Sequence, residues 1–314
     1  MKILMAGPRG FCAGVDRAVD TVERALAIVG APLYVKHEII HNKPVCEGLR
    51  ARGVVFTDDL TDVPVGSLVV FSAHGSSPAD YALAESRSLQ ILDATCPLVT
   101  KIHLEVRKFL KKGYGIIYIG HHGHVETLAT LGQAPDQLHL VTNLDEVAAL
   151  SDPGNDQLIY LTQTTLSIDE TKELVDALKA KFPRLQDPPT SDICYATQNR
   201  QDAIKEVCQT ADVCFVVGSQ TSSNSKSLRS VAEAMGVRAY LIDGPYEITD
   251  EMLEGAGIVA VTGGASAPED VIQSVVMRIK AHNDCGVEPV IVREEHMDFR
   301  VPQALIALEQ RHLK

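Results

Sequence analysis

The chain has 314 residues, of which 45% are hydrophobic and 22% are charged, and its formal net charge at pH 7 is −12. This length exceeds that of the usual single domain and predicts two or three domains with real cores. The acidic balance argues against a nucleic-acid-binding surface or an anchor to anionic membranes, and no apolar run reaches the roughly 18 residues of a membrane span. No targeting leader is visible after Met1, so we expect a cytoplasmic protein.

The dominant pattern along the chain is a short apolar strand followed by a helical segment, repeated many times. The expected strands are residues 2–7, 32–40, 67–73, 89–94, 115–121, 138–142, 158–163, 213–218, 238–243, 258–262 and 288–293. The expected helices are residues 15–29, 98–112, 168–182, 199–210, 224–235 and 268–282. This alternation predicts an α/β fold with parallel sheets. The proline-rich stretch 182–192 is the best candidate for a linker.

Three of the seven cysteines occupy similar places in this pattern. Cys12, Cys96 and Cys194 each follow an extended or loop segment and precede a helical pattern, in "FCAGVDRAVD", "TCPLVTKIHL" and "ICYATQNRQD". Near a helix N-terminus, the dipole and the free N–H groups favour an anion and lower a thiol pKa. The repetition predicts three similar α/β units that bring three thiolates together at the centre of a ring.

The other cysteines lack such a context. An odd number of cysteines argues against a disulfide framework in a chain of this kind, and free cysteines are among the most buried residues. We therefore expect core packing for the remaining four, which are Cys46, Cys208, Cys214 and Cys285.

Histidines occur in loops directly after several predicted strands. His41 lies in "IIHNKP", His74 in "FSAHGSSP", and His124 in "IGHHGHVET", two residues before Glu126. Sites in parallel α/β sheets form at the carboxyl ends of strands, so these positions favour a function over simple turn-making. Glu126 is either a helix-start acidic residue or a proton donor. The "HVE" of this loop is also similar to the H-x-E of zinc deaminases, but the accompanying P-C-x-x-C is missing.

Hydroxyl-rich loops form a further set of candidates for binding a small anion. They follow three predicted strands in "LTQTTLSIDE", "VGSQTSSNSKS" and "VTGGASAPE". Hydroxyls and free N–H groups at helix starts suit phosphate. The alternative is helix capping, because Ser167 and Ser266 each precede a glutamate by three residues. No P-loop or G-x-G-x-x-G fingerprint accompanies them, so a nucleotide site is not supported.

Three separated cysteines without an equal fourth predict an iron–sulfur cluster with one iron left open for substrate. Two alternatives remain at this point. A zinc-dependent hydrolase would use some of the same cysteine, histidine and glutamate residues. A non-catalytic iron–sulfur sensor would need the cysteines but not Glu126, the histidines or the hydroxyl loops.

The sequence resembles the hydroxymethylbutenyl diphosphate reductase family, whose members catalyse the last step of the methylerythritol phosphate route to isoprenoids. The resemblance rests on an ordered set of motifs between residues 7 and 269, namely "GPRGFCAGVDRA", "HNK", "SAHG", "DATCPLVTK", "GHHGHVE", "TQTTLS", "DICYATQNRQ", "SSNS" and "GASAPE". It implies three similar α/β domains with small parallel sheets, arranged pseudo-threefold around a central iron–sulfur cluster. The residue limits we expect are 1–13 for the first strand and cluster loop, 14–96, 97–190 and 191–281 for the domains, and 282–314 for a C-terminal segment.

The resemblance also implies roles for individual residues. Cys12, Cys96 and Cys194 are implied to ligate one [4Fe-4S] cluster. Glu126 is implied to deliver protons, with Thr164 orienting the allylic hydroxyl. The residues implied to form the diphosphate pocket are His41, His74, His124, Ser222, Ser223, Asn224 and Ser266.

The implied reaction is a reductive dehydroxylation of 4-hydroxy-3-methylbut-2-enyl diphosphate. Two electrons and two protons remove the hydroxyl as water and leave isopentenyl and dimethylallyl diphosphates. The implied electron donor is a ferredoxin or a flavodoxin, and no nucleic acid or membrane is expected as a partner. The chain departs from the family's common pattern at Gly7, Pro44 and Val125, and none of these is an expected ligand.

Overall fold

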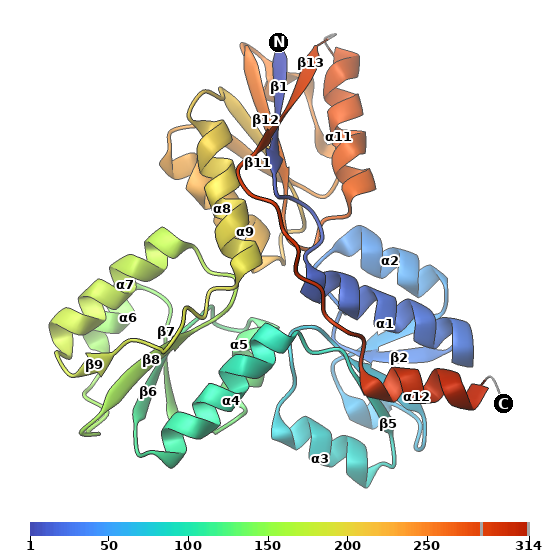
Figure 1. Cartoon of the computed structure of the whole chain (residues 1–314), viewed down its shortest axis with the longest axis vertical. Coiled ribbons are helices and arrows are strands. Elements are labelled where there is room, and N and C mark those ends of the chain that lie inside the picture. Colours follow the sequence, from blue (N-terminus) through green and yellow to red (C-terminus); the bar gives the residue numbers. More distant parts are fainter. Residues whose placement is uncertain (283–284, 313–314) are drawn as a thin grey trace.

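The computed structural model describes residues 1–282 and 285–312. Residues 283–284 and 313–314, which fall in the predicted C-terminal segment, lie outside the described residues. The chain forms three parallel sheets flanked by helices, and the three resulting lobes surround a common centre (Figure 1). This arrangement confirms the predicted α/β class and the three-sheet architecture.

The first lobe contains a four-stranded sheet in the order β3-β2-β4-β5. Its strands are β2 (Leu33–Lys36), β3 (Val54–Thr57), β4 (Leu68–Phe71) and β5 (Gln90–Asp93). Its helical elements are α1 (Ala13–Val29), α2 (Lys43–Ala51), η1 (Leu60–Asp62), α3 (Pro78–Ser86) and, from the end of the chain, α12 (Gln303–His312).

The second lobe contains a four-stranded sheet in the order β7-β6-β8-β9. Its strands are β6 (Gly115–Ile119), β7 (Leu138–Val141), β8 (Leu158–Thr162) and β9 (Leu185–Gln186). Its helices are α4 (Pro97–Lys111), α5 (Val125–Leu131), α6 (Leu144–Ala149) and α7 (Ile168–Lys181).

The third lobe contains a five-stranded sheet in the order β11-β10-β12-β1-β13, so both ends of the chain contribute a strand to it. Its strands are β1 (Lys2–Gly7), β10 (Val213–Val217), β11 (Arg238–Ile242), β12 (Ile258–Gly263) and β13 (Gly286–Ile291). Its helical elements are α8 (Tyr195–Cys208), α9 (Ser223–Ala234), η2 (Pro245–Glu247), α10 (Asp250–Leu253) and α11 (Glu269–His282).

Each sheet is buried on both faces, which explains why its central strands read as continuous apolar runs. Alternate residues of β10 enter separate clusters: Phe215 packs with Ile3 and Val259 on one face, and Val216 packs with Leu4 on the other. The same division occurs in the second lobe, where Ile117 and Ile116 belong to different clusters. Side chains that alternate across a strand produce these two half-cores.

Every predicted strand is present, with end positions that differ by a few residues. The prediction was wrong in omitting β3 and β9, and β9 lies inside the stretch that we expected to be a linker. Helices α2, α3, α6, α10 and α12 were also absent from the prediction, and α5 was indicated only by a possible helix start at Glu126. Most of these helices are short, and the hydrophobic periodicity of their sequences is too weak to distinguish them from loops.

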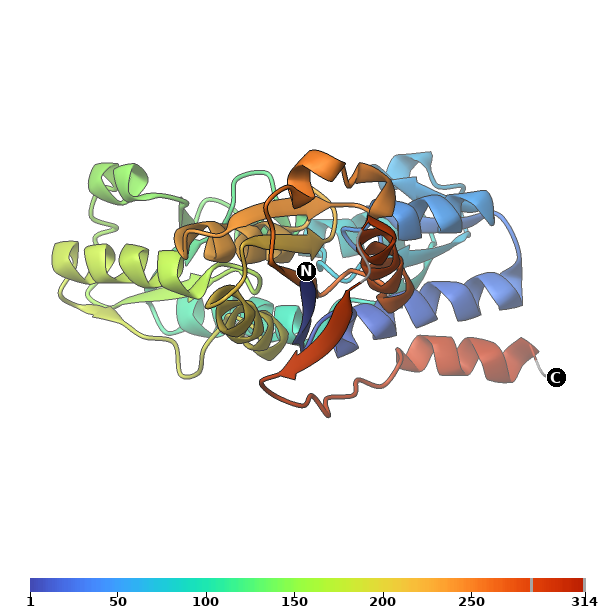
Figure 2. The ribbon, with the colours of Figure 1, turned by 90° about the horizontal axis from the view of Figure 1, so that it is seen from above.

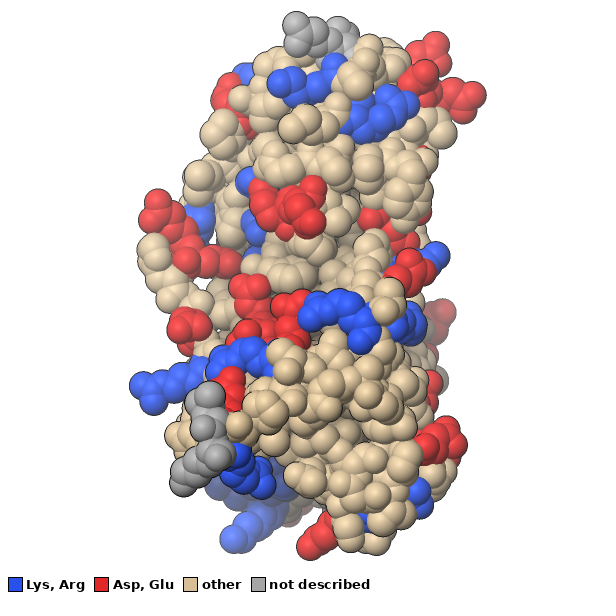
Figure 3. Space-filling view, turned by 90° about the vertical axis from the view of Figure 1, so that its right-hand side faces the viewer, with Lys and Arg blue, Asp and Glu red and all other residues tan. Residues whose placement is uncertain are grey.

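The lobes lie side by side in one layer, and β13 and the segment after it run along one face of that layer (Figure 2). Acidic and basic side chains are interspersed on the side of the molecule shown in Figure 3. Among the described residues, no helix is both long and apolar enough to cross a membrane. The residue limits proposed above for the domains remain a prediction.

Candidate active site

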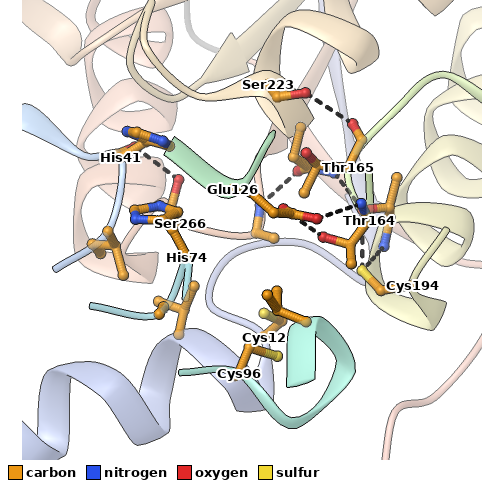
Figure 4. Close-up of a pocket in the computed structure, with 18 of the residues that line it drawn as sticks. Cys12, His41, His74, Cys96, Glu126, Thr164, Thr165, Cys194, Ser223 and Ser266 are labelled. Carbon is orange, nitrogen blue, oxygen red and sulfur yellow. Dashed lines mark hydrogen bonds between the residues drawn. The ribbon is translucent and has the colours of Figure 1, made fainter. Parts of the chain in front are cut away.

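A pocket lies where loops from the three lobes meet. These loops follow the carboxyl ends of parallel strands, where α/β folds place their sites. The pocket brings together all twelve residues singled out from the sequence, several of which Figure 4 labels. They are Cys12, His41, His74, Cys96, His124, Glu126, Thr164, Cys194, Ser222, Ser223, Asn224 and Ser266.

The three pocket cysteines occupy equivalent local positions. Cys12, Cys96 and Cys194 are the N-cap residues of α1, α4 and α8, as their sequence context predicted. Each cysteine also donates its backbone N–H to a carbonyl of a neighbouring pocket loop. The acceptors are the carbonyl oxygens of Ala265 at 3.1 Å, Ala73 at 3.0 Å and Thr164 at 3.0 Å, in the same order. The thiols are therefore held at contacts between separate loops.

The surroundings of the sulfurs fit a bulky group with soft, thiolate-binding metals. Gly14 leaves room beside two of the sulfurs: a Cβ at this position would come 2.7 Å from Cys96 Sγ and 3.9 Å from Cys12 Sγ. The third sulfur, of Cys194, lies 3.4 Å from the donating N–H of Thr197 and 3.2 Å from the Thr197 hydroxyl. Hydrogen bonds of this kind tune sulfur ligands in metal sites.

Burial opposes the expected effect of the helix N-termini on these thiols. It raises the pKa of Cys96 to about 12 and that of Cys194 to about 11, and it also raises the pKa of Cys12. The prediction of lowered thiol pKa values is therefore wrong for the pocket by itself, because desolvation outweighs the nearby N–H groups. Thiolates at these positions require a bound cation, and metal binding then releases the protons.

Glu126 is buried in the first turn of α5 and is held by Thr164 through two hydrogen bonds. The Thr164 N–H donates to Glu126 Oε1 at 2.7 Å, and the Thr164 hydroxyl donates to Oε2 at 2.9 Å. Burial raises the pKa of Glu126 to about 7, although the bonds from Thr164 lower it. A carboxyl with this pKa can give up or accept a proton near neutral pH.

The three pocket histidines cluster together. The ring centroid of His41 lies 4.1 Å from that of His74 and 4.8 Å from that of His124. Burial, with contributions from neighbouring histidines, lowers the pKa of His41 to about 4 and of His124 to about 3, and it places the pKa of His74 well below its ordinary value. The imidazoles are therefore neutral in the pocket at pH 7.

His124 is oriented by its position as the N-cap of α5. Its Nδ1 accepts the Glu126 N–H at 3.2 Å, so the proton of the neutral ring resides on Nε2. The Nε2 atoms of His124 and His41 are both buried without a hydrogen-bond partner among the described residues. A buried N–H without an acceptor, such as the Nε2–H of His124, costs free energy. A bound anion would accept its hydrogen bond.

The hydroxyl and amide groups come from the start of α9 and from the loop that precedes α11. Ser222 caps α9, and its Oγ lies 3.4 Å from the Ser266 hydroxyl, which donates to the His41 carbonyl at 2.9 Å. Asn224 Oδ1 accepts the Ala265 N–H at 2.8 Å, and the Ser223 hydroxyl lies 3.3 Å from the Thr165 carbonyl. Ser266 thus lines the pocket, whereas Ser167 is a capping residue that accepts the Glu170 N–H at 3.3 Å.

Several further residues from the sequence motifs lie outside the pocket lining. His122, in the same loop as His124, contacts Glu146 Oε1 at 3.0 Å on the surface. Cys46, Cys208, Cys214 and Cys285 are buried, as predicted. Val125 occupies the first helical position of α5 without displacing Glu126 from Thr164.

Sequence reasoning missed two residues near the cysteines. Thr197 contacts the Cys194 sulfur, and its place three residues after an N-cap is a spacing that could have indicated it. Arg200 is 0% exposed and donates to the Gly10 carbonyl at 2.8 Å, beside Cys12. An arginine in a helical pattern is normally expected on the surface, so the sequence held no signal for its burial.

The chain is similar to known proteins along nearly its whole length. The family model described as LytB protein matches residues 3–280. The 4-hydroxy-3-methylbut-2-enyl diphosphate reductase of Ralstonia nicotianae is 52% identical over 304 residues, which cover 97% of this chain and 94% of that protein. The enzyme of the same name from Hahella chejuensis is 51% identical over 311 residues, covering 97% of this chain and 98% of that protein.

A solved structure extends the similarity to the whole fold. The E-1-hydroxy-2-methyl-but-2-enyl-4-diphosphate reductase of Plasmodium falciparum superposes with a TM-score of 0.96 at 38% identity, covering 100% of this chain and 99% of that chain. Family, sequence and fold therefore point in one direction. The chain belongs to the LytB protein family, and it is similar to these reductases along nearly their full length.

Proposed function

We propose that the chain reduces 4-hydroxy-3-methylbut-2-enyl diphosphate to isopentenyl and dimethylallyl diphosphates. The observation that carries this proposal is the composition of one pocket, which combines three thiols, a carboxyl that titrates near neutral pH, and a cluster of neutral N–H and O–H donors. In the balanced reaction, two electrons and two protons enter, the allylic C–O bond breaks, and the hydroxyl leaves as water.

Cys12, Cys96 and Cys194 would hold one [4Fe-4S] cluster. Among the described residues, no three His, Cys, Asp or Glu side chains converge on a point that suits a single metal ion. In a polynuclear cluster each thiolate binds a different iron, so the sulfurs need to surround a larger volume. When bound, the cluster supplies electrons one at a time and a Lewis-acidic iron.

The diphosphate would lie against the loops before α9 and α11 and the three histidines. The unpartnered Nε2 atoms of His41 and His124 support this assignment, as do the hydroxyls of Ser222 and Ser266. The N-terminus of α9 adds a favourable dipole. His74, Ser223 and Asn224 complete the proposed diphosphate site. Binding of the remote diphosphate fixes the position of the reacting carbon.

Glu126 would deliver the proton that converts the departing hydroxyl to water. Thr164 fits a role in orienting the substrate hydroxyl, because its own proton is donated to Glu126 Oε2 at 2.9 Å while its oxygen lone pairs are free to accept. His124 would supply a donor beside Glu126. Burial keeps the Glu126 carboxyl protonated below about pH 7, so the proton is present when the C–O bond breaks.

The reaction needs an external source of single electrons, and we propose a ferredoxin or a flavodoxin in the cytoplasm. Both carry one electron at a time at low potential, which matches a cluster that accepts one electron per encounter. The substrate itself is a small anionic molecule, which the pocket between the three lobes would hold.

The ligand assignment is tested by Cys96→Ser, with Cys46→Ser as the matched control. Cys46 is buried in the first lobe and its Sγ lies 3.4 Å from the Ile40 carbonyl, a hydrogen bond that serine keeps. We expect iron and sulfide content to fall sharply in the Cys96 variant only. Unchanged iron in that variant would remove Cys96 from the ligand set.

The family assignment disfavours the two alternatives, and one anaerobic preparation separates all three. The reductase contains iron and sulfide and forms both isoprenoid diphosphates when reduced. A zinc hydrolase would be colourless and contain about one zinc, as in a mononuclear catalytic site. A sensor would contain the cluster and form no product.

A further inference from the structure

The segment after β13 crosses from the third lobe to the first and passes the start of α1 (Figures 1 and 2). We call residues 292–302 the C-terminal strap. The strap lies beyond residues 3–280, which the family model matches. It begins with Val292, whose N–H donates to the Gly7 carbonyl at 2.9 Å, and it leads into α12, whose Leu305 is fully buried in the core of the first lobe.

Arg200 joins the strap to the Cys12 loop. Its Nη2 donates to the Gly10 carbonyl at 2.8 Å and lies 3.5 Å from the Phe11 carbonyl, and its Nε is 3.2 Å from the Gly10 carbonyl. Its Nη1 donates to the Ala196 carbonyl at 2.9 Å, two residues after Cys194. The same Nη1 contacts Glu295 of the strap at 3.0 Å. All five N–H groups of the guanidinium therefore have an acceptor.

Arg17 makes the corresponding connection at the Cys96 loop. Its Nη1 donates to the Thr95 carbonyl at 2.9 Å, and its Nη2 donates to the Asp93 carbonyl at 3.3 Å. Its Nε donates to the Arg300 carbonyl of the strap at 2.8 Å. Each arginine thus contacts the residue directly before one pocket cysteine and also contacts the strap.

Glu295 is turned inward from a strap whose neighbouring side chains face solvent. Its side chain is 16% exposed, whereas Glu294 and His296 are exposed by 79% and 82%. Besides Arg200, it accepts a hydrogen bond from Asn199 Nδ2 at 2.9 Å, and Arg293 of the strap donates to Asn199 Oδ1 at 3.2 Å. This network fixes the strap against α8, the helix that Cys194 caps.

We propose that Arg17 and Arg200 are positioning residues for the cysteine loops, and that the C-terminal strap holds both arginines in place for that role. The proposal rests on the proposed function, because the cysteines matter in this way only if they hold a cluster. A rigid guanidinium fork defines the directions of several carbonyls at once, which the point charge of a lysine cannot do. The strap is therefore part of the structure that shapes the cluster site.

The test compares anaerobically reconstituted Arg200→Lys, Arg17→Lys and Glu295→Gln with the unaltered chain. The matched control is Arg24→Met. This change breaks the 2.6 Å ion pair between Arg24 of α1 and Glu309 of α12, and within the described part of the chain Arg24 makes no hydrogen bond to a cysteine loop. The readouts are iron and sulfide content, the electron spin resonance spectrum of the reduced protein, the rate at which cluster absorbance is lost in air, and the melting temperature of the metal-free chain.

We expect Arg200→Lys and Arg17→Lys to lose the cluster in air severalfold faster than the unaltered chain and to show altered spin spectra. Glu295→Gln should show a smaller change in the same direction, and Arg24→Met should match the unaltered chain. If the arginine variants lower the melting temperature of the metal-free chain but leave spectra and cluster lifetime unchanged, the arginines support only the fold and the proposal is wrong.

Glu295→Gln decides the question if an arginine variant fails to fold, since it removes one charge and keeps the size of the side chain. A cluster lifetime and spectrum identical to those of the unaltered chain would then overturn the role of the strap. Failure of the proposed function gives a different result, because the unaltered chain itself would then either contain no iron and sulfide or contain a cluster and form no product.

Discussion

At the scale of single residues, the carboxyl of Glu126 is subject to two opposing influences. Burial disfavours its charged form, and two hydrogen bonds from Thr164 favour it. Burial wins, and the pKa rises to about 7. The same competition at Cys96 raises a thiol pKa that the helix N-terminus alone would lower. Desolvation is therefore the larger effect in this pocket.

Glu126→Gln should reduce turnover by about 10²- to 10⁴-fold, the usual contribution of a positioned acid or base. The amide cannot donate an acidic proton, and this loss lowers turnover. Because the amide keeps the size of the side chain, cluster content should not change. The measurement is the rate of product formation by chemically reduced enzyme. The matched control is Glu105→Gln, since Glu105 also has a pKa raised by burial but lies outside the pocket. Near-normal rates in the Glu126 variant would exclude its role in proton delivery.

The pH dependence of turnover should follow the titration of the same carboxyl. Because the pKa of Glu126 is about 7, the acid form predominates below that pH and is lost above it. Turnover should therefore fall on the alkaline side, with a midpoint near the pKa. A rate–pH profile of Glu126→Gln should lack this alkaline limb. The same limb in the variant would assign the titration to another group.

The sequence identified the candidate site residues because each belongs to a short motif that follows an apolar strand or, for Cys194, the proline-rich stretch 182–192. It held no comparable signal for Arg200. Nothing in "YATQNRQ" distinguishes a buried arginine from a solvent-exposed one. Its burial results from the Cys12 loop and from Glu295, which lie 190 and 95 residues away in the chain. Contacts of this separation depend on the assembled fold rather than on local pattern.

At the scale of elements, three helices begin at the pocket cysteines. Helix α1 starts so close to α4 that its second residue, Gly14, has no room for a side chain: a Cβ would come 2.7 Å from Cys96 Sγ. Helix propensity alone would favour alanine there, since glycine costs about 0.5–1 kcal/mol in a helix. The close approach of the sulfur outweighs that preference.

Gly14→Ala should therefore lower iron and sulfide content, because Cys96 must move to accommodate the methyl group. The matched control is Gly48→Ala in α2, where a Cβ meets nothing within 4 Å. That change should raise the free energy of unfolding by about 0.5–1 kcal/mol and leave iron content unchanged. Equal iron content in both variants would contradict the claim that the Cys96 sulfur lies too close to Gly14 for a side chain there.

The elements themselves were predictable to different degrees. Strands such as β6 and β10 are buried along their whole length and form unbroken apolar runs, so pattern alone located them. Helix α5 has only seven residues and begins with a histidine cap. Its helical state depends on packing in the second lobe, because an isolated helix of this length is unstable. Strand β3 has one buried residue and occupies a sheet edge, which weakens its apolar signal.

At the scale of the whole molecule, the pocket depends on all three lobes. The sulfur donors are the caps of α1, α4 and α8, and the loops that receive their N–H groups belong to further elements. A group bound by all three cysteines would connect the lobes directly. Ligands that bind only the folded state stabilise it, and binding of a metal group couples to folding in the same way.

Reconstitution should therefore raise the melting temperature of the chain under anaerobic conditions. The difference between the reconstituted and the metal-free chain should shrink in Cys96→Ser, which loses one of the three attachments. Calorimetry under nitrogen provides the measurement. Equal melting temperatures with and without iron and sulfide would show that the cluster does not link the lobes.

The most direct test of the proposed function is an anaerobic assay of iron, sulfide and zinc, combined with electron spin resonance spectra with and without substrate. The proposed reductase should contain about four irons and four sulfides per chain, as one [4Fe-4S] cluster requires. It also predicts a spectrum that changes when 4-hydroxy-3-methylbut-2-enyl diphosphate is added, and formation of both isoprenoid diphosphates. A colourless chain containing zinc, or a cluster whose spectrum ignores the substrate and yields no product, would contradict it.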